Sequence, residues 1–126
     1  MYHISFPQRS NRASWVFIGL ITDLNDNPID LTGCSMLFEV RERVDPYLGG
    51  VWGCGSYGRC VLEASTDNGK ITFIQLGTFR WYFSPTDMRT LRPGTYDTGL
   101  TLTSADGSQV AQLSIGPLPI VDGVVP

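Results

Sequence analysis

Residues 91–120 read LRPGTYDTGLTLTSADGSQVAQLSIGPLPI, the most regular pattern in the sequence. Two stretches of alternating apolar and polar side chains flank the turn residues ADGS. The residues that share one face of the two stretches are Tyr96, Thr98, Leu100 and Leu102, then Ala111, Leu113 and Ile115. Alternation places successive side chains on opposite faces of a strand, and Asp-Gly favours a tight turn. The segment therefore predicts a β-hairpin with one buried face.

A short helical turn is expected just before this hairpin. Ser84 is a suitable N-cap, Pro85 stands at the first helical position, and Pro93 with Gly94 ends the segment. A tyrosine at the following strand entrance is typical of the tyrosine corner of immunoglobulin-like sandwiches, whose hydroxyl bonds back to the upstream backbone. We expect Tyr96 to form such a corner; the alternative is an ordinary buried aromatic residue in another β fold.

Five further stretches predict short strands and bring the expected total to about seven. They cover residues 14–23, 34–43, 60–66, 70–76 and 79–84. The first, SWVFIGLITD, is a nearly continuous apolar run that predicts a buried strand. The second alternates, which predicts a half-buried strand with Cys34, Met36, Phe38 and Val40 pointing inward. We therefore expect an all-β fold: an antiparallel immunoglobulin-like β-sandwich with one short helical turn.

Between the first two of these strands, LNDNPIDLTG predicts a turn. Asn25, Asp26 and Asn27 can bond to nearby backbone, Pro28 has a fixed φ, and Gly33 closes the segment. Asp23, Asp26 and Asp30 also suggest a calcium site, because calcium prefers several oxygen ligands. Their spacing does not match a dedicated calcium loop, so a turn is the better interpretation.

The chain divides into an N-terminal arm, residues 1–13, and a sandwich domain, residues 14–126. The arm is polar with isolated aromatic residues, Tyr2 and Phe6, and has no core of its own. Two interpretations fit it equally well: an arm laid on a neighbouring subunit, or a frayed terminus.

A glycine-rich loop, residues 45–59, interrupts the sandwich domain. It is longer than compact domains usually contain without a role. Its aromatic residues Tyr47, Trp52 and Tyr57 could provide contact area to a partner. The alternative is that the loop folds back and Trp52 closes one end of the sandwich.

Residue types that support catalysis or metal binding are sparse. His3, the single histidine, lies in the arm, so a Ser-His-Asp or Cys-His centre would lack a fixed base. Cys54 and Cys60 are too far apart for the usual zinc-ligand spacing, and no Cys or His pair completes a ligand set. Free thiols are expected there, with a loop disulfide as the alternative under oxidising conditions. We expect no enzymatic activity, no metal and no cofactor.

Composition argues against two classes of partner. The formal net charge is −3 and Lys70 is the single lysine, whereas nucleic-acid binding needs clustered positive charge. No apolar run approaches the roughly 20 residues of a membrane-spanning helix, and the first residues lack the apolar centre of a signal peptide. We expect a protein made in the cytoplasm that binds neither nucleic acid nor membrane.

Turn and packing residues also carry a family resemblance. They are Asp23, Pro28, Ile29, Asp30, Leu31 and Gly33 in the first turn, and Gly94, Tyr96, Leu100, Asp106, Gly107 and Gly116 in the last hairpin. With these residues, the stretch from Ser14 to Val125 resembles small virion proteins of tailed bacteriophages. Proteins of this kind resemble immunoglobulin-like modules of baseplates, tail-fibre attachment points or capsid decorations.

The resemblance implies a structural role. We expect a virion protein, made in the host cytoplasm, that is present in several copies and contacts other virion proteins at the tail, baseplate or fibre attachment. The predicted partner-binding residues are Tyr47, Trp52, Tyr57, Tyr2 and Phe6, and the predicted structural residues are Tyr96, Gly94, Pro28, Asp30 and Gly33. The alternatives are a capsid decoration protein, and a carbohydrate-binding module whose loop aromatics stack on host glycans.

Overall fold

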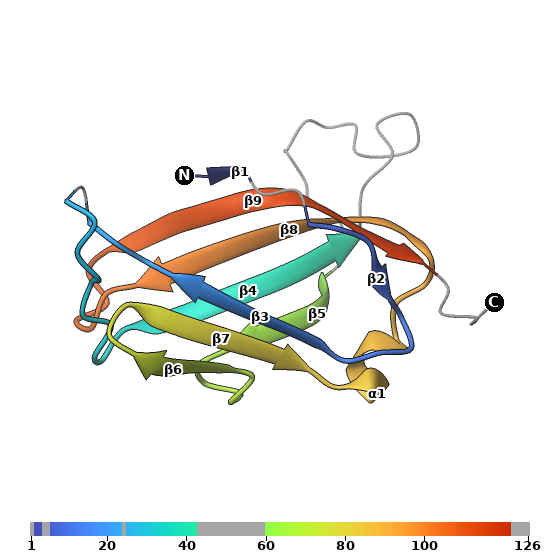
Figure 1. The fold of residues 1–126 in the computed structure, drawn as a ribbon, viewed down its shortest axis with the longest axis horizontal. Coiled ribbons are helices and arrows are strands. Elements are labelled where there is room, and N and C mark those ends of the chain that lie inside the picture. The colour runs from blue at the N-terminus through green and yellow to red at the C-terminus, as the bar shows by residue number, and fades with distance from the viewer. Residues whose placement is uncertain (1, 4–5, 24, 43–59, 122–126) are drawn as a thin grey trace.

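The computed structural model describes residues 2–3, 6–23, 25–42 and 60–121, and for residues 2–3 only the backbone. Within this part of the chain, two β-sheets pack face to face and a short helix lies at one end (Figure 1). The prediction of an all-β fold with two sheets is confirmed. The elements are β1 (Tyr2–His3), β2 (Arg9–Ser10), β3 (Trp15–Leu20), β4 (Ser35–Glu42), β5 (Cys60–Ser65), β6 (Ile71–Gln75), β7 (Thr78–Phe83), α1 (Pro85–Met88), β8 (Gly94–Thr103) and β9 (Val110–Val121).

The two sheets differ in width. Among the described strands, sheet A has six, in the order β1-β9-β8-β4-β5 with β2 also paired to β9, whereas sheet B has three, in the order β3-β7-β6. The seven longer strands pair antiparallel, but β1 and β2 pair with β9 in parallel. β4 lies between β8 and β5, whereas the second strand of a constant-type immunoglobulin domain lies in the sheet of the first and fifth. The strand order therefore differs from the immunoglobulin order at β4.

Aromatic rings from both sheets fill the space between them. The Trp81 ring of sheet B stacks on Phe38 of sheet A, with ring centroids 4.0 Å apart. It also stacks on Phe17 of its own sheet at 4.4 Å, and Trp15 meets it edge-on at 5.4 Å. Aromatic pairs of this kind contribute about 0.5–1.5 kcal/mol each beyond the burial of their surface. This cluster sets how closely the two sheets approach.

The burial of β4 and β3 shows how far the sequence pattern is reliable. In β4, Met36, Phe38 and Val40 are buried, as their alternation predicts. The prediction that the whole run of residues 14–23 is buried is wrong: alternate residues of β3 are more than two-fifths exposed, namely Val16, Ile18 and Leu20. The reason is that sheet A covers one face of sheet B, and no described residue packs on the other face.

The N-terminal segment belongs to the sandwich. Phe6 is buried, its ring lies 5.3 Å from that of Trp15, and its N–H donates to the carbonyl of Pro117 in β9 at 3.2 Å. The prediction that Phe6 contacts a partner is therefore wrong, because its side chain is part of the core. The other predicted arm residue, Tyr2, pairs with Ser114 through the backbone, and its side chain lies outside the described part of the structure.

The helix α1 forms where its capping residues predict it. The Ser84 hydroxyl accepts the N–H of Asp87 at 3.1 Å, and the Asp87 carboxylate accepts the N–H of Ser84 at 3.1 Å, which completes a capping box. Lys70 donates to the same carboxylate at 2.7 Å. This ion pair ties the start of the helix to the turn before β6.

The residues predicted to be structural lie in two tight connections. The Tyr96 hydroxyl donates to the carbonyl of Arg92 at 2.8 Å, four residues upstream, and Gly94 begins β8. In the turn before β4, Pro28 forms an isolated bridge with Thr22.

The rest of that turn is held by a carboxylate and a glycine. The Asp30 carboxylate accepts two hydrogen bonds from Thr32, one from its backbone N–H at 2.9 Å and one from its side-chain hydroxyl at 2.6 Å. Gly33 has a φ of 79°, in the left-handed region that favours glycine. Both connections therefore use the local interactions that their residue types favour.

We predict that Phe6→Ala destabilises the protein by about 3–5 kcal/mol, because truncating a fully packed ring removes its burial and leaves a cavity between the sheets. Urea unfolding followed by tryptophan fluorescence measures the change. Gln8→Ala, an exposed position in the same segment, is the control and should stay within about 0.5 kcal/mol of the parent. Equal stability of the Phe6 variant and the parent would show that the N-terminal segment is not part of the core.

Candidate protein-interaction surface

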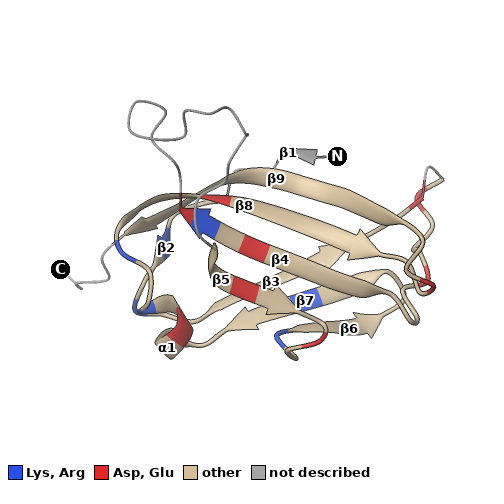
Figure 2. Ribbon diagram, turned by 180° about the vertical axis from the view of Figure 1, so that it is seen from behind, with Lys and Arg blue, Asp and Glu red and all other residues tan. Residues whose placement is uncertain are grey.

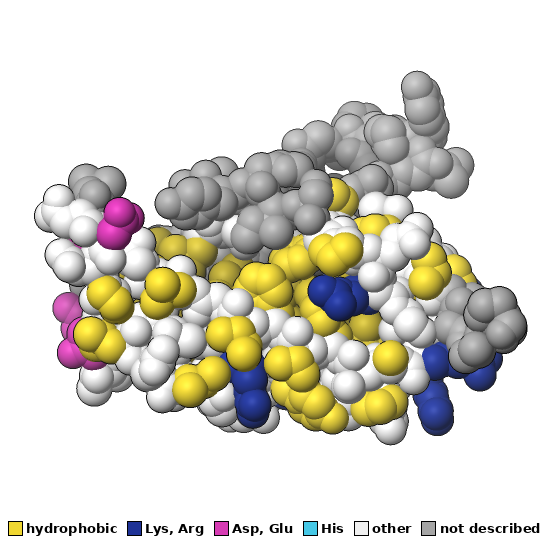
Figure 3. All heavy atoms as spheres, in the orientation of Figure 1, with side chains coloured by type: hydrophobic (Ala, Val, Ile, Leu, Met, Phe, Trp, Pro, Cys, Tyr) yellow, Lys and Arg dark blue, Asp and Glu magenta, His cyan; other side chains and the backbone are white. Residues whose placement is uncertain are grey.

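The outer side of sheet B carries a group of exposed apolar side chains, which we call the sheet B face. Its members are Val16 (47% exposed), Ile18 (59%) and Leu20 (60%) on β3, Ile74 (53%) on β6 and Tyr82 (43%) on β7. Figure 3 shows hydrophobic side chains gathered over these three strands. The fractions correspond to roughly 500 Å² of exposed surface, at the upper end of the largest apolar patch on a typical monomer.

Cross-strand pairing makes the sheet B face continuous. Val16 lies directly opposite Tyr82, and Ile18 lies directly opposite Arg80, which in turn pairs with Thr72 on β6. Directly opposite residues of an antiparallel pair have their Cβ atoms about 4.5–5.5 Å apart, so their side chains touch. One exposed cation, Arg80, therefore lies within the face, between Ile18 of β3 and Thr72 of β6.

The outer side of sheet A has a different character. Its strands carry charged residues, including Glu39, Arg41 and Glu63 (Figure 2), and Glu39 forms an ion pair with Arg41. Of the residues in β3, β6 and β7, all of which the structure describes, Arg80 alone is charged. Charge depletion over an apolar centre is typical of the core of protein interfaces. The sheet B face is the candidate for protein contact on these grounds.

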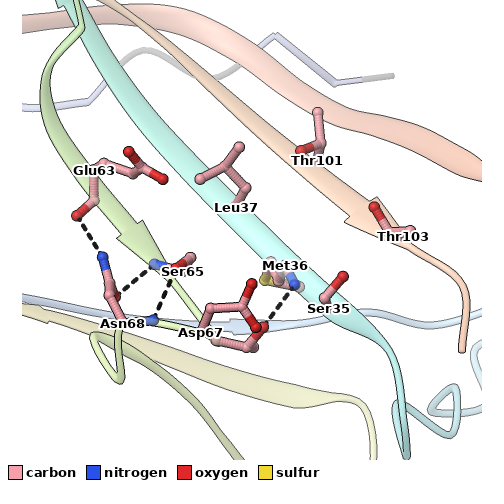
Figure 4. A pocket seen from close by; sticks show the side chains of 10 residues that line it. Ser35, Met36, Leu37, Glu63, Ser65, Asp67, Asn68, Thr101 and Thr103 are labelled. Atoms are coloured by element: carbon pink, nitrogen blue, oxygen red, sulfur yellow. Dashed lines mark hydrogen bonds between the residues drawn. The ribbon is translucent and has the colours of Figure 1, made fainter. Parts of the chain in front are cut away.

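A polar hollow of about 560 Å³ lies on the outer side of sheet A beside the β5–β6 turn. In Figure 4, the side chains of this turn lie on one side of the hollow and Thr101 and Thr103 of β8 on the other. The Asn68 amide oxygen accepts the N–H groups of Ser65 and Lys70, at 3.0 and 2.9 Å, and its amide nitrogen donates to the carbonyl of Glu63. Asn68 thereby holds the turn itself, and the hollow offers no converging group for a ligand.

A second hollow, of about 310 Å³, lies between the sheets next to β3, and we call it the inter-sheet slot. Phe17 and Gly19 of β3 and Phe79 of β7 line it from sheet B, and Leu100 of β8 and Leu113 of β9 line it from sheet A. Its walls are mainly apolar. The slot can take an apolar side chain, but no described titratable group faces it that could do chemistry there.

The residues predicted from the sequence to bind partners do not contribute to the sheet B face. Tyr47, Trp52 and Tyr57 lie outside the described residues, so their roles stay predictions, and the same holds for the side chain of Tyr2. Phe6 is in the core. The sequence did not predict this face, because the apolar run of β3 is typical of a buried strand. The local pattern does not indicate whether one or both faces of such a strand are covered.

The described cysteines are free thiols, Cys34 and Cys60. Burial raises the pKa of the Cys60 thiol, and the nearby charge of Glu39 raises it further, so thiolate formation is disfavoured. Cys54 lies outside the described residues, as does any pairing it makes. The described residues contain no group of three or more His, Cys, Asp and Glu side chains that could hold a metal ion, and no described helix is long and apolar enough to cross a membrane.

Three of the aspartates that the sequence places at turns do have turn roles. Hydrogen bonds from the backbone of Asn27 and Asn25 lower the pKa of Asp23. A hydrogen bond from the Thr32 hydroxyl lowers the pKa of Asp30. In the β8–β9 turn, the hydroxyl of Ser104, then the backbone N–H and hydroxyl of Ser108, lower the pKa of Asp106 to about 2. All three carboxylates are stabilised as anions by local turn hydrogen bonds.

We predict that the β8–β9 turn loosens as the pH falls from about 4 to about 2. The pKa of Asp106 is lower in the folded protein than its ordinary value of 3.8, so its stabilising effect is complete above that value and is lost as the pH drops through about 2. A carboxyl-carbon NMR titration should give a midpoint near 2 for Asp106, and the signal should vanish in Asp106→Asn. A midpoint near the ordinary value would contradict the hydrogen-bonded turn.

Comparisons with protein-family models and with curated proteins found no match to this chain. Its function is therefore inferred from the surface that the fold leaves exposed, together with the resemblance carried by its own turn residues. Among the described residues, the sheet B face is an exposed apolar surface that the packing of the sandwich does not account for.

Proposed function

We propose that this protein is a structural module of a tailed-bacteriophage particle that binds neighbouring virion proteins through the sheet B face. The tail, baseplate or fibre attachment is the proposed place. The observation that carries the proposal is the exposed apolar face formed by Val16, Ile18, Leu20, Ile74 and Tyr82. The largest apolar patch on a monomer is often functional, and protein contact is one of its established uses.

The energetics of the face suit a specific contact. A standard interface buries about 800 Å² on each partner, so the roughly 500 Å² of the sheet B face would form most of its apolar centre. At about 25 cal/mol per Å², its burial would contribute about 12 kcal/mol before the costs of association. Tyr82, which lies opposite Val16 in this face, is one of the residue types enriched at interface hot spots.

Charge defines the chemistry of the proposed partner. Arg80 lies within the apolar face and would lose water on contact, which is costly unless a carboxylate faces it. Two copies of this face packed against each other would bring their Arg80 side chains into one apolar interface, with no acidic residue from β3, β6 or β7 to pair with them. The proposed partner is therefore another protein that presents apolar side chains around an Asp or Glu.

The assignment to phage particles rests on the motif resemblance, and two structural observations support it. Asp30 and Gly33 form the tight turn that opens the resembling pattern, and Tyr96 bonds to the upstream backbone at the start of the last hairpin. These interactions explain why such residues would recur in a family of small sandwiches. They support a shared fold, and the contact role follows from the exposed face.

A closer relationship with immunoglobulin-like modules is part of the proposal. The Tyr96 hydroxyl bond is the interaction that defines a tyrosine corner. Six of the seven longer strands also divide between the sheets as in a constant-type domain: β3, β6 and β7 in one, and β5, β8 and β9 in the other. The proposed module is thus an immunoglobulin-related sandwich in which β4 belongs to the wider sheet.

Quantitative mass spectrometry of purified particles tests the proposed role. We expect the number of copies per particle to correspond to a few rings of subunits. A copy number close to that of the protein that forms the capsid shell would instead support the capsid-decoration alternative. Ile74→Lys should lower incorporation about tenfold or more, because it places a second cation on the apolar face that already contains Arg80.

Thr101→Lys, which adds the same charge to the outer side of sheet A, is the matched control and should be incorporated like the parent. Both variants should keep the parent melting temperature within a few degrees. Absence of the protein from intact particles would overturn the phage assignment. Equal incorporation of the two variants would overturn the role of the sheet B face.

A further inference from the structure

The edge of sheet B at β3 has a row of backbone groups without a hydrogen-bond partner among the described residues. Val16 lies opposite Tyr82 of β7, but the Tyr82 N–H donates to the carbonyl of Lys70 on the far side, at 2.9 Å. Val16 and Tyr82 therefore form a non-hydrogen-bonded pair, whose backbone groups point away from each other. Because the direction alternates along a strand, the N–H and C=O groups of Val16, Ile18 and Leu20 all point out of the sheet edge. No described strand pairs with them.

β3 also lacks the devices that usually protect an edge strand. Its six residues, WVFIGL, include no charge and no proline, and its register with β7 is regular over all six pairs. The other edge of sheet B, β6, contains an irregularity between Phe73 and Gln75 and follows Lys70. The β5 edge of sheet A also pairs through an irregularity, between Val40 and Arg41 of β4. Bulges and charges blunt an edge, and an unblunted apolar edge accepts another strand.

A strand added at this edge would find an apolar floor. The inter-sheet slot begins beside Gly19 and extends to Leu100 and Leu113 of sheet A. Sheet A extends past β3 with β9 and the short strands β1 and β2, so it already lies beneath the position that an added strand would take (Figure 1). Inward side chains of that strand would therefore pack on sheet A as those of β3 do.

A positive charge lies at the other end of the same edge. The guanidinium of Arg9, on β2, sits 5.7 Å from the centre of the Trp15 ring. Its Nε is buried with no hydrogen-bond partner among the described residues. Trp15 precedes Gly19 by four residues, which corresponds to about 13 Å along a strand. A carboxylate near Arg9 and an apolar side chain in the slot would thus lie four residues apart, on one face of an extended segment.

From these features we infer that β3 accepts an extended segment of a neighbouring protein as an added antiparallel strand of sheet B. The segment pairs with the backbone of Val16, Ile18 and Leu20, inserts an apolar side chain into the inter-sheet slot, and places an Asp or Glu four residues later beside Arg9. A second copy of β3 does not meet this requirement, because WVFIGL contains no acidic residue. The inference rests on the proposed function and specifies one way in which the module holds a neighbour.

The probe is a capped, fluorescein-labelled peptide with the sequence Leu-Thr-Val-Thr-Glu. When the peptide pairs with β3 in the antiparallel direction, its Leu lies opposite Gly19 and its Glu lies opposite Trp15. In this register both Thr residues direct their N–H and C=O groups toward β3. Fluorescence anisotropy should show saturable binding to the full chain with a Kd below about 1 mM. N-methylation of both Thr residues should weaken binding about tenfold or more, because it removes the bonds to β3.

Two further peptides test the backbone pairing and the charge separately. N-methylation of Val and Glu, whose N–H groups point away from β3, should change the Kd less than about threefold, and replacing Glu by Gln should weaken binding about threefold or more. On the protein side, Ile18→Pro should match the effect of Thr methylation. Its N–H faces the open edge, so proline removes no bond to β7. Thr101→Lys, on the outer side of sheet A, should bind the peptide like the parent.

Three results would overturn the inference: no binding at about 1 mM peptide, equal effects of the two methylation patterns, or equal effects of Ile18→Pro and Thr101→Lys. The methylated peptides keep the test decisive if Ile18→Pro does not fold. A failed peptide test leaves incorporation into particles and the Ile74→Lys effect intact. Failure of the proposed function would instead appear as absence of the protein from particles.

Discussion

The stacking of Trp81 on one ring from each sheet is the interaction on which the rest of the fold depends. Phe38 comes from sheet A and Phe17 from sheet B, and each lies about one ring thickness from the indole. Rings this large dominate the burial of a small sandwich and fix the distance at which its sheets pack. Once that distance is set, the gap beside β3 is wide enough to require a further ring, which Phe6 supplies from the N-terminal segment.

This packing uses up the inner faces and leaves the two outer faces with different chemistry. Sheet A has charged and hydroxyl side chains on its outer side, and two of the charged ones, Glu39 and Arg41, form an ion pair with each other. Sheet B has mainly apolar side chains and one arginine outside, and the backbone groups at its β3 edge have no partner in the described part of the chain. Both open features lie on the same three strands. A neighbour could therefore pack on the face and extend the sheet in a single binding event, which would restrict its orientation more than either contact alone.

The elements that the sequence predicted well are those fixed by local interactions. The side chains of Ser84 and Asp87 accept hydrogen bonds from each other's backbone N–H groups within one turn. The start of the helix can therefore be predicted from a short stretch of sequence. The hydroxyl of Tyr96 reaches a carbonyl four residues away, and the strand alternation of Met36, Phe38 and Val40 reports a sheet with one buried face. In each case the partners lie close together in the chain, and the residue type has few other uses.

The elements that the sequence predicted poorly depend on distant parts of the chain. An apolar run such as β3 indicates that its side chains favour burial. It does not indicate whether other elements cover one face of the strand or both. Phe6 stands in a polar segment without a periodic pattern, and its place in the core follows from pairing with β9 more than a hundred residues later. The sheet to which β4 belongs is likewise decided by competition between long-range pairings. These pairings between distant segments decide which face of sheet B is exposed. The candidate site could therefore not be predicted from the local sequence.

The central claim, that the sheet B face is buried against a neighbour in the assembled particle, is tested most directly by hydroxyl-radical footprinting. The isolated protein and the intact particle would be labelled in parallel and compared residue by residue by mass spectrometry. The account predicts that oxidation of Ile18, Leu20 and Tyr82 falls several-fold in the particle, while that of Leu37 on the outer side of sheet A does not change. Equal labelling of the sheet B residues in both samples would contradict it.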